Sequence, residues 1–419
     1  MKTFINRYLQ LNIILKFLPF LILYICICIF LPRKELYSDE YRYLMFAHNL
    51  LNGFYSNHLP DINLWNGPGY PLFLMPFVYL KISVLGIRIL NAFLLFASLI
   101  INFKTLCVYS SKKNALIFVV LMGMYFPIFE ALRTIMTECI SWFLVSLICF
   151  LFIKNYRSGK NSWKLIILCA FMIAFLAMTK VIFGYVILIM IILSMILSAF
   201  PKYRSCAKTS ALIFFISMIL CLPWLTYTYN ITNKLFYWSN SGNMSLYTMS
   251  TPFKGESGDW YNLTALSQNP NHKHFIDSIS KLKPLPQDEA LKIAAVQNIK
   301  NYPLKYLSNI FSNVGRLFFR PNVSTTNRVV GYLPAIPNLI LVLVMFMAIF
   351  ISIRYYSKIP QELFFLLLFI SIYLFGSLLL STYRRMFYIS IPFWFIFILY
   401  TLTLDTIFST KIKKLLAKF

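Results

Sequence analysis

The sequence predicts an all-α polytopic membrane protein with about ten transmembrane helices. Hydrophobic residues make up 59% of the chain and charged residues only 12%, whereas soluble domains carry about 25% charged residues. Many apolar runs are close in length to the about 20 residues that an α-helix needs to cross a bilayer. The segments that we expect to span are 13–31, 87–109, 114–129, 138–153, 164–180, 183–200, 209–228, 334–353, 362–380 and 387–408.

The distribution of basic residues predicts the orientation of these segments. The formal net charge is +26, and short basic clusters between apolar runs are typical of cytoplasmic loops. This pattern places both termini in the cytoplasm and the polar segments 32–86 and 229–333 outside. Because the cations do not form a stripe with stacking aromatic residues, we expect no nucleic-acid partner. The clusters are Lys112 and Lys113; Lys154, Arg157, Lys160 and Lys164; Lys202, Arg204 and Lys208; Arg354 and Lys358; Lys411, Lys413 and Lys414.

Residues 70–86 are apolar, but they are short for a span and contain Pro71 and Pro76. If they crossed the membrane, Lys112 and Lys113 would move outside and every later basic loop would change sides. A juxtamembrane helix that lies on the outer interface preserves the charge pattern. We therefore expect this segment to lie flat.

Three regions follow from this topology. Residues 1–228 form an N-terminal transmembrane catalytic module that includes the first outer loop, 32–86. Residues 229–333 form an outer loop or small cap with one helical pattern, from Glu289 to Phe311. Residues 334–419 form the C-terminal transmembrane helices. The long outer loop contains no cysteine, so neither a disulfide framework nor a thiolate metal site is expected there.

The first outer loop opens with Asp39 and Glu40, directly after the first span. An amphipathic helix is expected from Ser38 or Asp39, with Gly53 at its end. Asp39 can be a helix cap that interacts favourably with the helix dipole. It can also be a general base at the membrane surface. Adjacent carboxylates on a helix point in different directions, so one would act and the other would cap or orient.

Further candidates lie at other outer boundaries of the spans. Glu138 begins a span, where it can stabilise the helix terminus, position an acceptor or bind a divalent cation through oxygen ligands. Snorkelling explains any one of the outer cations, but several together suggest a site for an anionic head group. These cations are Arg42, Arg133, Lys180, Arg384 and Arg385.

Several motifs, taken in order, resemble the GT-C glycosyltransferases. The resemblance is to the branch that contains protein O-mannosyltransferases and lipid A aminoarabinose transferases, and it covers roughly residues 10–400. No single motif is specific to this family. The resemblance rests on the order of the motifs and on their positions in the topology. The motifs are Asp39-Glu40-Tyr41-Arg42-Tyr43, the turn at 64–72 before a Pro-Leu helix, 132–138 ending in an acidic residue, Leu222-Pro223-Trp224, Tyr229-Asn230, 240–247 and Tyr383-Arg384-Arg385.

The resemblance implies a GT-C-like fold and a sugar donor linked to polyprenyl phosphate, used on the outer face of a bacterial plasma membrane. If the roles of the family's motif residues apply to the matching positions here, Asp39 is the catalytic base and Glu138 is the second acidic residue. The candidates for contact with the donor phosphate are Arg42, Lys180 and either Arg384 or Arg385, and Glu40, Tyr43 and Arg133 belong to the substrate-binding set. A single displacement would invert the anomeric carbon. Relatives often carry a Lys in the turn before the Pro-Leu helix, where this chain has Gly67-Pro68-Gly69-Tyr70.

Other functions remain open from the sequence. A transporter or flippase of lipid-linked glycans would need polar residues at mid-membrane depth, whereas the clearest candidates gather at the outer boundary. A polymerase or ligase would differ mainly in its acceptor, and a non-catalytic scaffold would not need Asp39 and Glu138. Whether the sugar is a hexose or a pentose, whether the acceptor is a glycan, lipid or protein, and whether a metal is needed are not fixed by these patterns.

Overall fold

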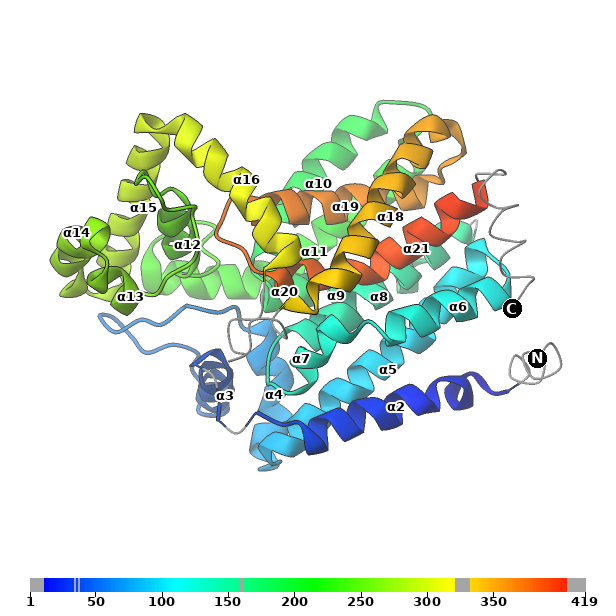
Figure 1. Cartoon of the computed structure of the whole chain (residues 1–419), viewed down its shortest axis with the longest axis horizontal. Helices are drawn as coiled ribbons and strands as arrows, with labels where there is room; N and C mark the ends of the chain where they lie inside the picture. The colour runs from blue at the N-terminus through cyan, green and yellow to red at the C-terminus, as the bar shows by residue number, and fades with distance from the viewer. Residues whose placement is uncertain (1–10, 34, 37, 159–161, 321–331, 405–419) are drawn as a thin grey trace.

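The computed structural model of the chain describes residues 11–33, 35–36, 38–158, 162–320 and 332–404. These residues form helices and connecting loops, with no strand among them. Apolar helices form a bundle, and a smaller group of helices, which we call the cap, lies at one end of it (Figure 1). The first described helix begins, and the last one ends, on the side of the bundle away from the cap. The predicted all-α class is confirmed.

Every predicted apolar segment coincides with a helix or a bent helix pair. Within the described part of the chain, six helices are long and apolar enough to cross a membrane, and a pair bent by 41° raises the number to seven. Three shorter apolar helices account for the remaining segments. The six are α2 (Ile13–Phe30), α5 (Val84–Tyr109), α8 (Glu138–Arg157), α11 (Arg204–Thr232), α18 (Ala335–Arg354) and α19 (Gln361–Leu378). The others are α6 (Lys112–Gly123) with η1 (Phe126–Ile128) and α7 (Phe129–Leu132), then α9 (Trp163–Thr179), α10 (Ile182–Ser198) and α21 (Ile391–Leu404).

The bundle has the surface that a lipid environment requires. On α18, the side chains of Leu343, Phe346 and Phe350 are each more than 60% exposed, and lipid would cover such a stripe without a hydrophobic cost. Inside the bundle, Asn102 of α5 donates a 2.8 Å hydrogen bond to Ser146 of α8. Residues 405–408 of the last predicted span, and the basic cluster at 411–414, lie outside the described residues.

The segment 70–86 contains a helix too short to cross a bilayer. Helix α4 (Gly69–Tyr79) has 11 residues, which at 1.5 Å per residue is about 16 Å against a hydrocarbon layer of about 30 Å. The chain then turns through Lys81, whose φ of 52° is left-handed, and α5 begins after its N-cap Ser83. Helix α4 packs against α3 (Ser38–Leu51) and α9. These bounds agree with a non-spanning helix.

The cap contains more helices than the sequence indicates. It consists of α12 (Gly242–Met249), α13 (Leu263–Gln268), α14 (Pro270–Ser280) and α15 (Pro284–Asn301). Helix α16 (Pro303–Phe319) leads from the cap back to the bundle (Figure 1). The single helix predicted from Glu289 to Phe311 is therefore wrong. It breaks at Tyr302, whose φ of −132° and ψ of 56° are not helical, because a proline disfavours the helical conformation in the residue before it.

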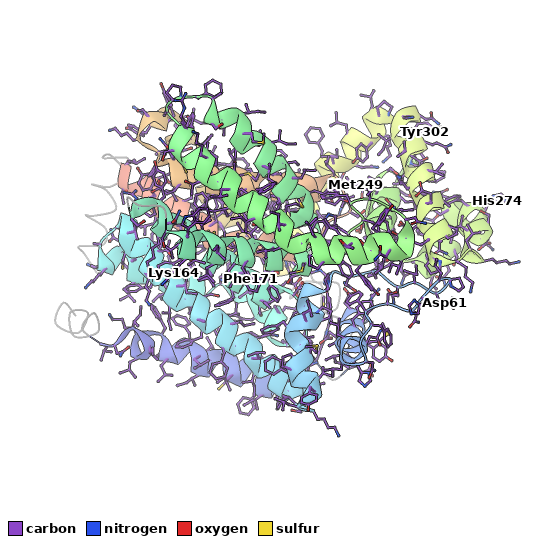
Figure 2. All side chains as sticks on the ribbon, turned by 180° about the vertical axis from the view of Figure 1, so that it is seen from behind. Asp61, Lys164, Phe171, Met249, His274 and Tyr302 are labelled. Carbon is purple, nitrogen blue, oxygen red and sulfur yellow. The ribbon has the colours of Figure 1, made fainter. Side chains whose placement is uncertain are left out.

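Hydrogen bonds fasten the cap and α16 to the loop at 379–383. The Asn313 amide of α16 donates to the carbonyl oxygens of Leu378 and Leu380 at 3.0 and 2.6 Å. The Ser381 hydroxyl donates to the Gly258 carbonyl at 2.8 Å. The first outer loop lies beside the cap, with Asp61 far from Lys164 at the other end of the bundle (Figure 2). The next helix, α20 (Arg384–Tyr388), is thereby held at the junction of bundle and cap.

Candidate active site

A cavity of about 1430 Å³ lies where the bundle meets the cap and the first outer loop. Its walls come from segments far apart in the chain: α3, the turn at 65–67, the start of α8, the break between α9 and α10, the cap, and residues 376–388. Seven of the nine residues predicted for the site line it. They are Asp39, Arg42, Tyr43, Glu138, Lys180, Arg384 and Arg385.

Five of these side chains form an alternating series of charges, which we call the ion-pair chain (Arg42, Asp39, Arg385, Glu138 and Lys180). Asp39 Oδ1 lies 2.6 Å from an Arg42 nitrogen, and its Oδ2 lies 3.5 Å from Arg385. Glu138 Oε1 lies 3.9 Å from Arg385 Nε and 3.2 Å from Lys180 Nζ. The ion-pair chain contains three cations and two carboxylates, so its net charge is one positive charge.

The local structure of each segment brings these charges together. Asp39 lies in the first turn of α3, and Glu138 is the first residue of α8, where the helix dipole favours negative charge. Lys180 lies at the break between α9 and α10, with an extended backbone (φ −128°, ψ 93°). Its side chain can therefore leave the helix axis and reach Glu138. Arg385 comes from the short helix α20.

Two glycines allow the first outer loop to pack against this break. A Cβ atom on Gly67 would lie 2.2 Å from the Met178 carbonyl oxygen, and one on Gly69 would lie 2.5 Å from Thr179 Oγ1. Any side chain at either position would push the loop away from Lys180. The packing therefore excludes a side chain at positions 67 and 69. Cations from other segments line the cavity.

Polar and aromatic groups surround the ion-pair chain. Tyr43 is buried, its hydroxyl accepts a 3.1 Å hydrogen bond from the Asn66 amide, and burial raises its pKa well above the ordinary value. It therefore stays a neutral phenol. Arg384 is buried, with one nitrogen 3.9 Å from Glu130 and with Nη1 lacking a hydrogen-bond partner among the described residues.

Two predicted site residues lie away from the cavity. Glu40 is fully buried and accepts a 2.7 Å hydrogen bond from the Ile135 backbone N–H, with Arg88 3.6 Å away. It joins α3 to the loop before α8. Arg133 donates through Nε to the Leu31 carbonyl oxygen. Of the two adjacent carboxylates, Asp39 is the one that reaches the cavity.

The cavity also has lining residues that were not selected from the sequence. Trp65 lies under the Arg42 guanidinium, with 5.2 Å from its ring to the guanidinium carbon. Arg320 pairs with Asp259 and stacks on the Tyr383 ring at 4.8 Å. Arg320 has no local sequence signal, but Trp65 stands beside the glycine-rich turn at 67–69, where the backbone approaches α9 closely.

A metal-binding role is not tested by this geometry. Both carboxylates of the ion-pair chain already contact cationic side chains. Among the residues that the structure describes, no group of three or more His, Cys, Asp or Glu side chains is arranged to hold a metal ion. The divalent cation stays a prediction from the sequence.

The fold and the site together define an all-helical membrane protein with a charged cavity at one end of its bundle. Comparison with family models gives no match, and comparison with curated proteins gives none either. Among solved structures, the chain is similar to the crystal structure of ArnT from Cupriavidus metallidurans bound to undecaprenyl phosphate. The two are 12% identical, the match covers 92% of this chain and 77% of that chain, and the TM-score is 0.43. At this identity and TM-score the likeness assigns neither a family nor a substrate.

Proposed function

We propose that this chain is a GT-C-type glycosyltransferase that moves a sugar from a polyprenyl-phosphate donor to an acceptor on the outer face of the membrane. The observation that carries the proposal is the ion-pair chain, which places two carboxylates and three cations in one large cavity. Such a transfer needs a base for the acceptor and positive charge for the departing phosphate. The sequence motifs that resemble GT-C enzymes supply residues of both kinds.

The two carboxylates suit different roles. Asp39 is 20% exposed and lines the cavity, so an acceptor hydroxyl can reach it. Glu138 is 4% exposed and contacts Lys180 and Arg385. We assign Asp39 as the general base and Glu138 as a positioning residue that holds the two cations.

The cations suit the leaving phosphate. Lys180 and Arg385 are held by Glu138, and Arg384 has an unpartnered buried nitrogen that can donate to an anion. Cations fixed in a partly dry cavity stabilise negative charge that develops in the transition state, with little reorganisation. A single guanidinium group can also bind two phosphate oxygens at the same time.

An apolar wall next to these charges suits a lipid-linked donor. Tyr185 and Ile189 of α10 line the cavity and are 50% and 41% exposed, and Leu235 is 83% exposed. An isoprenoid chain could lie along this wall while its phosphate lies against the cations. In the reaction, the acceptor oxygen forms a bond to the anomeric carbon as the bond from that carbon to the phosphate oxygen breaks. The phosphate leaves with the electron pair, the acceptor proton passes to Asp39, and the anomeric centre is inverted.

The proposal is tested with the full chain reconstituted in liposomes. Undecaprenyl-phosphate-linked hexoses and pentoses are supplied together with glycan, lipid and peptide acceptors, because the phosphate leaves only as the sugar passes to an acceptor, and release of undecaprenyl phosphate is measured. We expect release with at least one donor, reduced more than about tenfold in Arg385→Gln because a fixed cation contributes a few kcal/mol to the transition state. Arg354→Gln, at the end of α18 outside the cavity, is the matched control. Absence of release with every donor would contradict the proposal, as would equal release by the two variants. Lipid extraction from a deletion strain then shows which glycan or lipid loses a sugar.

A further inference from the structure

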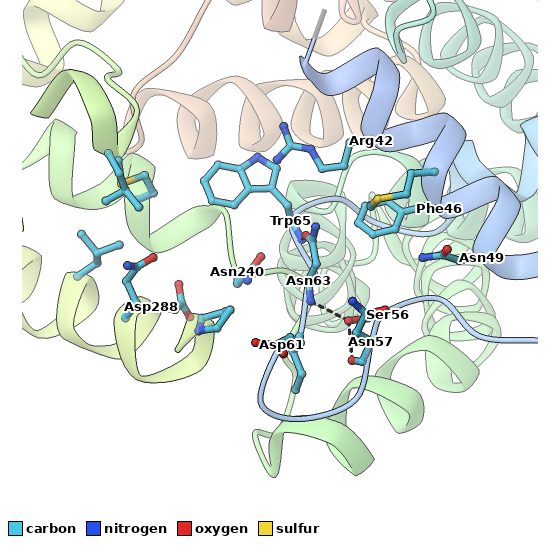
Figure 3. Close-up of a pocket in the computed structure, with 17 residues that line it drawn as sticks. Arg42, Phe46, Asn49, Ser56, Asn57, Asp61, Asn63, Trp65, Asn240 and Asp288 are labelled. Atoms are coloured by element: carbon cyan, nitrogen blue, oxygen red, sulfur yellow. Dashed lines mark hydrogen bonds between the residues drawn. The ribbon is translucent and has the colours of Figure 1, made fainter. Parts of the chain in front are cut away.

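A second cavity, which we call the side cavity, opens between the first outer loop and the cap (Figure 3). Its volume is about 480 Å³, within the range of about 300–1,000 Å³ that is common for small-molecule sites. Arg42 and Trp65 line both this cavity and the larger one. Because Arg42 is bonded to Asp39 at 2.6 Å, the side cavity ends close to the proposed base.

The lining of the side cavity is dominated by neutral hydrogen-bonding groups. Five amide side chains, one hydroxyl, two carboxyl groups, one indole and one guanidinium line it together with apolar residues. Amides both donate and accept hydrogen bonds, and carboxylates accept them. The amides are those of Asn49, Asn57, Asn63, Asn240 and Gln287.

Two buried polar atoms in the lining have no hydrogen-bond partner among the described residues. They are Asn240 Oδ1 and Asp288 Oδ1. Asp288 is 3% exposed, and its other oxygen accepts a 2.8 Å hydrogen bond from the Tyr237 hydroxyl. Folded proteins pair most buried polar atoms. Asn243 also hydrogen-bonds to the Asp288 carboxyl group, and the two oxygens in the lining can accept further hydrogen bonds from a ligand that donates them.

The walls of the side cavity are fixed to each other. The Asn240 N–H donates to the Leu64 carbonyl at 3.0 Å and joins the cap to the first outer loop. Lys283 and Asp61 form a 3.0 Å ion pair on the rim. Within the loop, the Asn63 N–H donates to Ser56 at 2.7 Å, as the dashed lines of Figure 3 show. The cavity is thus formed by the fold rather than by loose side chains.

The charge of the lining selects the chemical class of the ligand. Arg42 is the only cation among the described residues that line the cavity, and it is already engaged by Asp39 and the Trp65 ring. Asp61 is paired with Lys283 on the rim, and the Asp288 carboxyl lies inside the lining, so the cavity offers an anionic ligand no unengaged cation. A ligand rich in hydroxyl groups can donate to the two unpaired oxygens, accept from the amides and place its C–H face against the indole.

Resting on the function proposed above, we propose that the side cavity is the acceptor subsite and binds a neutral saccharide. The acceptor hydroxyl then extends past Trp65 and Arg42 to Asp39, while the donor phosphate occupies the larger cavity. This assignment names a glycan, in preference to a protein or an acidic lipid head group, as the acceptor class.

The proposal is tested by saccharide binding to the full chain in nanodiscs without donor. The probes are neutral hexose and N-acetylhexosamine oligosaccharides, matched oligosaccharides with uronic acid or phosphate groups, and serine- and threonine-rich peptides. We expect binding of neutral oligosaccharides, with a Kd raised about tenfold in Asn240→Ala and in Asp288→Asn, since each removes one hydrogen-bond acceptor or its charge. Gln297→Ala, on an exposed part of α15, is the matched control and should bind like the wild type.

The binding assay and the liposome assay together distinguish failure of the acceptor-subsite proposal from failure of the transferase proposal. Preferential binding of acidic oligosaccharides or peptides overturns the side-cavity assignment, as does absence of neutral binding or equal binding by wild type and both cavity variants. If Asp288→Asn does not fold, Asn240→Ala and the wild-type probe preference still decide. Neutral binding without donor turnover in the liposome assay leaves the saccharide site standing and refutes the transferase. Donor turnover without neutral binding refutes the acceptor subsite alone.

Discussion

Replacing Lys180 by Met removes the cation closest to Glu138 and leaves a carboxylate that is 4% exposed. At their separation of 3.2 Å and an effective dielectric constant of about 20, the attraction between unit charges is ~5 kcal/mol. Arg385, 3.9 Å from Glu138, retains ~4 kcal/mol on the same basis. Removing one partner of a buried ion pair lowers the free energy of unfolding by about 3–5 kcal/mol, because the other charge stays buried and uncompensated. Because Arg385 remains, we expect the free energy of unfolding to fall by about 3 kcal/mol.

The double variant Lys180→Met/Glu138→Gln separates the structural effect from the catalytic one. Neutralising the carboxylate removes the uncompensated charge, so about 1 kcal/mol or more of stability should return, while donor turnover stays low. Unfolding in detergent is followed by tryptophan fluorescence. Lys283→Met is the matched control, because Lys283 pairs with Asp61 at 3.0 Å with both side chains more than half exposed, and such surface pairs contribute at most about 1 kcal/mol. Equal losses in Lys180→Met and Lys283→Met would refute the reasoning, as would a double variant less stable than Lys180→Met.

Three other predictions concern the groups that support the site. Glu40→Gln should lower the unfolding free energy by about 1–3 kcal/mol, because a buried backbone N–H loses a charged acceptor; wild-type stability with lost turnover would instead make Glu40 a substrate-binding residue. Gly69→Ala should lower the unfolding free energy by a similar ~1–3 kcal/mol, since its Cβ would meet Thr179 at 2.5 Å, whereas Gly315→Ala, with nothing within 4 Å, should not. Burial opposes ionisation of Glu256, but hydrogen bonds from neighbouring side chains lower its pKa to about 2. This folded-state pKa is below the ordinary value of about 4.3, so its stabilisation of the cap is present above about pH 4 and is lost as the pH falls toward 2. Hydrogen exchange in α12–α15 checks this loss, and unchanged acid sensitivity in Glu256→Gln would contradict it.

The sequence predicts the bundle well because lipid imposes a simple rule on it. A helix in a bilayer must be about 20 residues long and apolar on its outside, so hydropathy alone locates all ten apolar segments. Their ends are less certain. Helix α11 extends from Arg204 to Thr232, beyond the predicted 209–228, because polar residues at both ends are helical without being apolar.

The cap and the choice of site residues depend on tertiary contacts that local patterns do not encode. The four cap helices bury only a small apolar cluster, and the sequence indicates a helical pattern only from Glu289 onward, within α15. The sequence shows that Asp39 and Glu40 point in different directions. Which one faces the cavity is decided by the Ile135 N–H and Arg88, which hold Glu40 inside.

The sequence singles out Arg42 and the segments 64–72 and 240–247 but does not show that they enclose a second cavity. Its walls come from residues 42–65, 240–263 and 284–291, which the fold brings together although the first and last of them, Arg42 and Leu291, lie far apart in the chain. Its chemistry depends on which amide and carboxylate oxygens remain unpaired after folding. Such pairing can be read only from a structure.

The central claim is that Asp39 takes the proton from the acceptor, and Asp39→Asn tests it most directly. The substitution keeps the size of the side chain and can still accept a hydrogen bond from Arg42, but an amide cannot act as a base at neutral pH. With undecaprenyl-phosphate-linked sugar and acceptor in liposomes, we expect turnover to fall by about 10²-fold or more, while insertion and thermal unfolding change little. Wild-type turnover by Asp39→Asn would contradict the account.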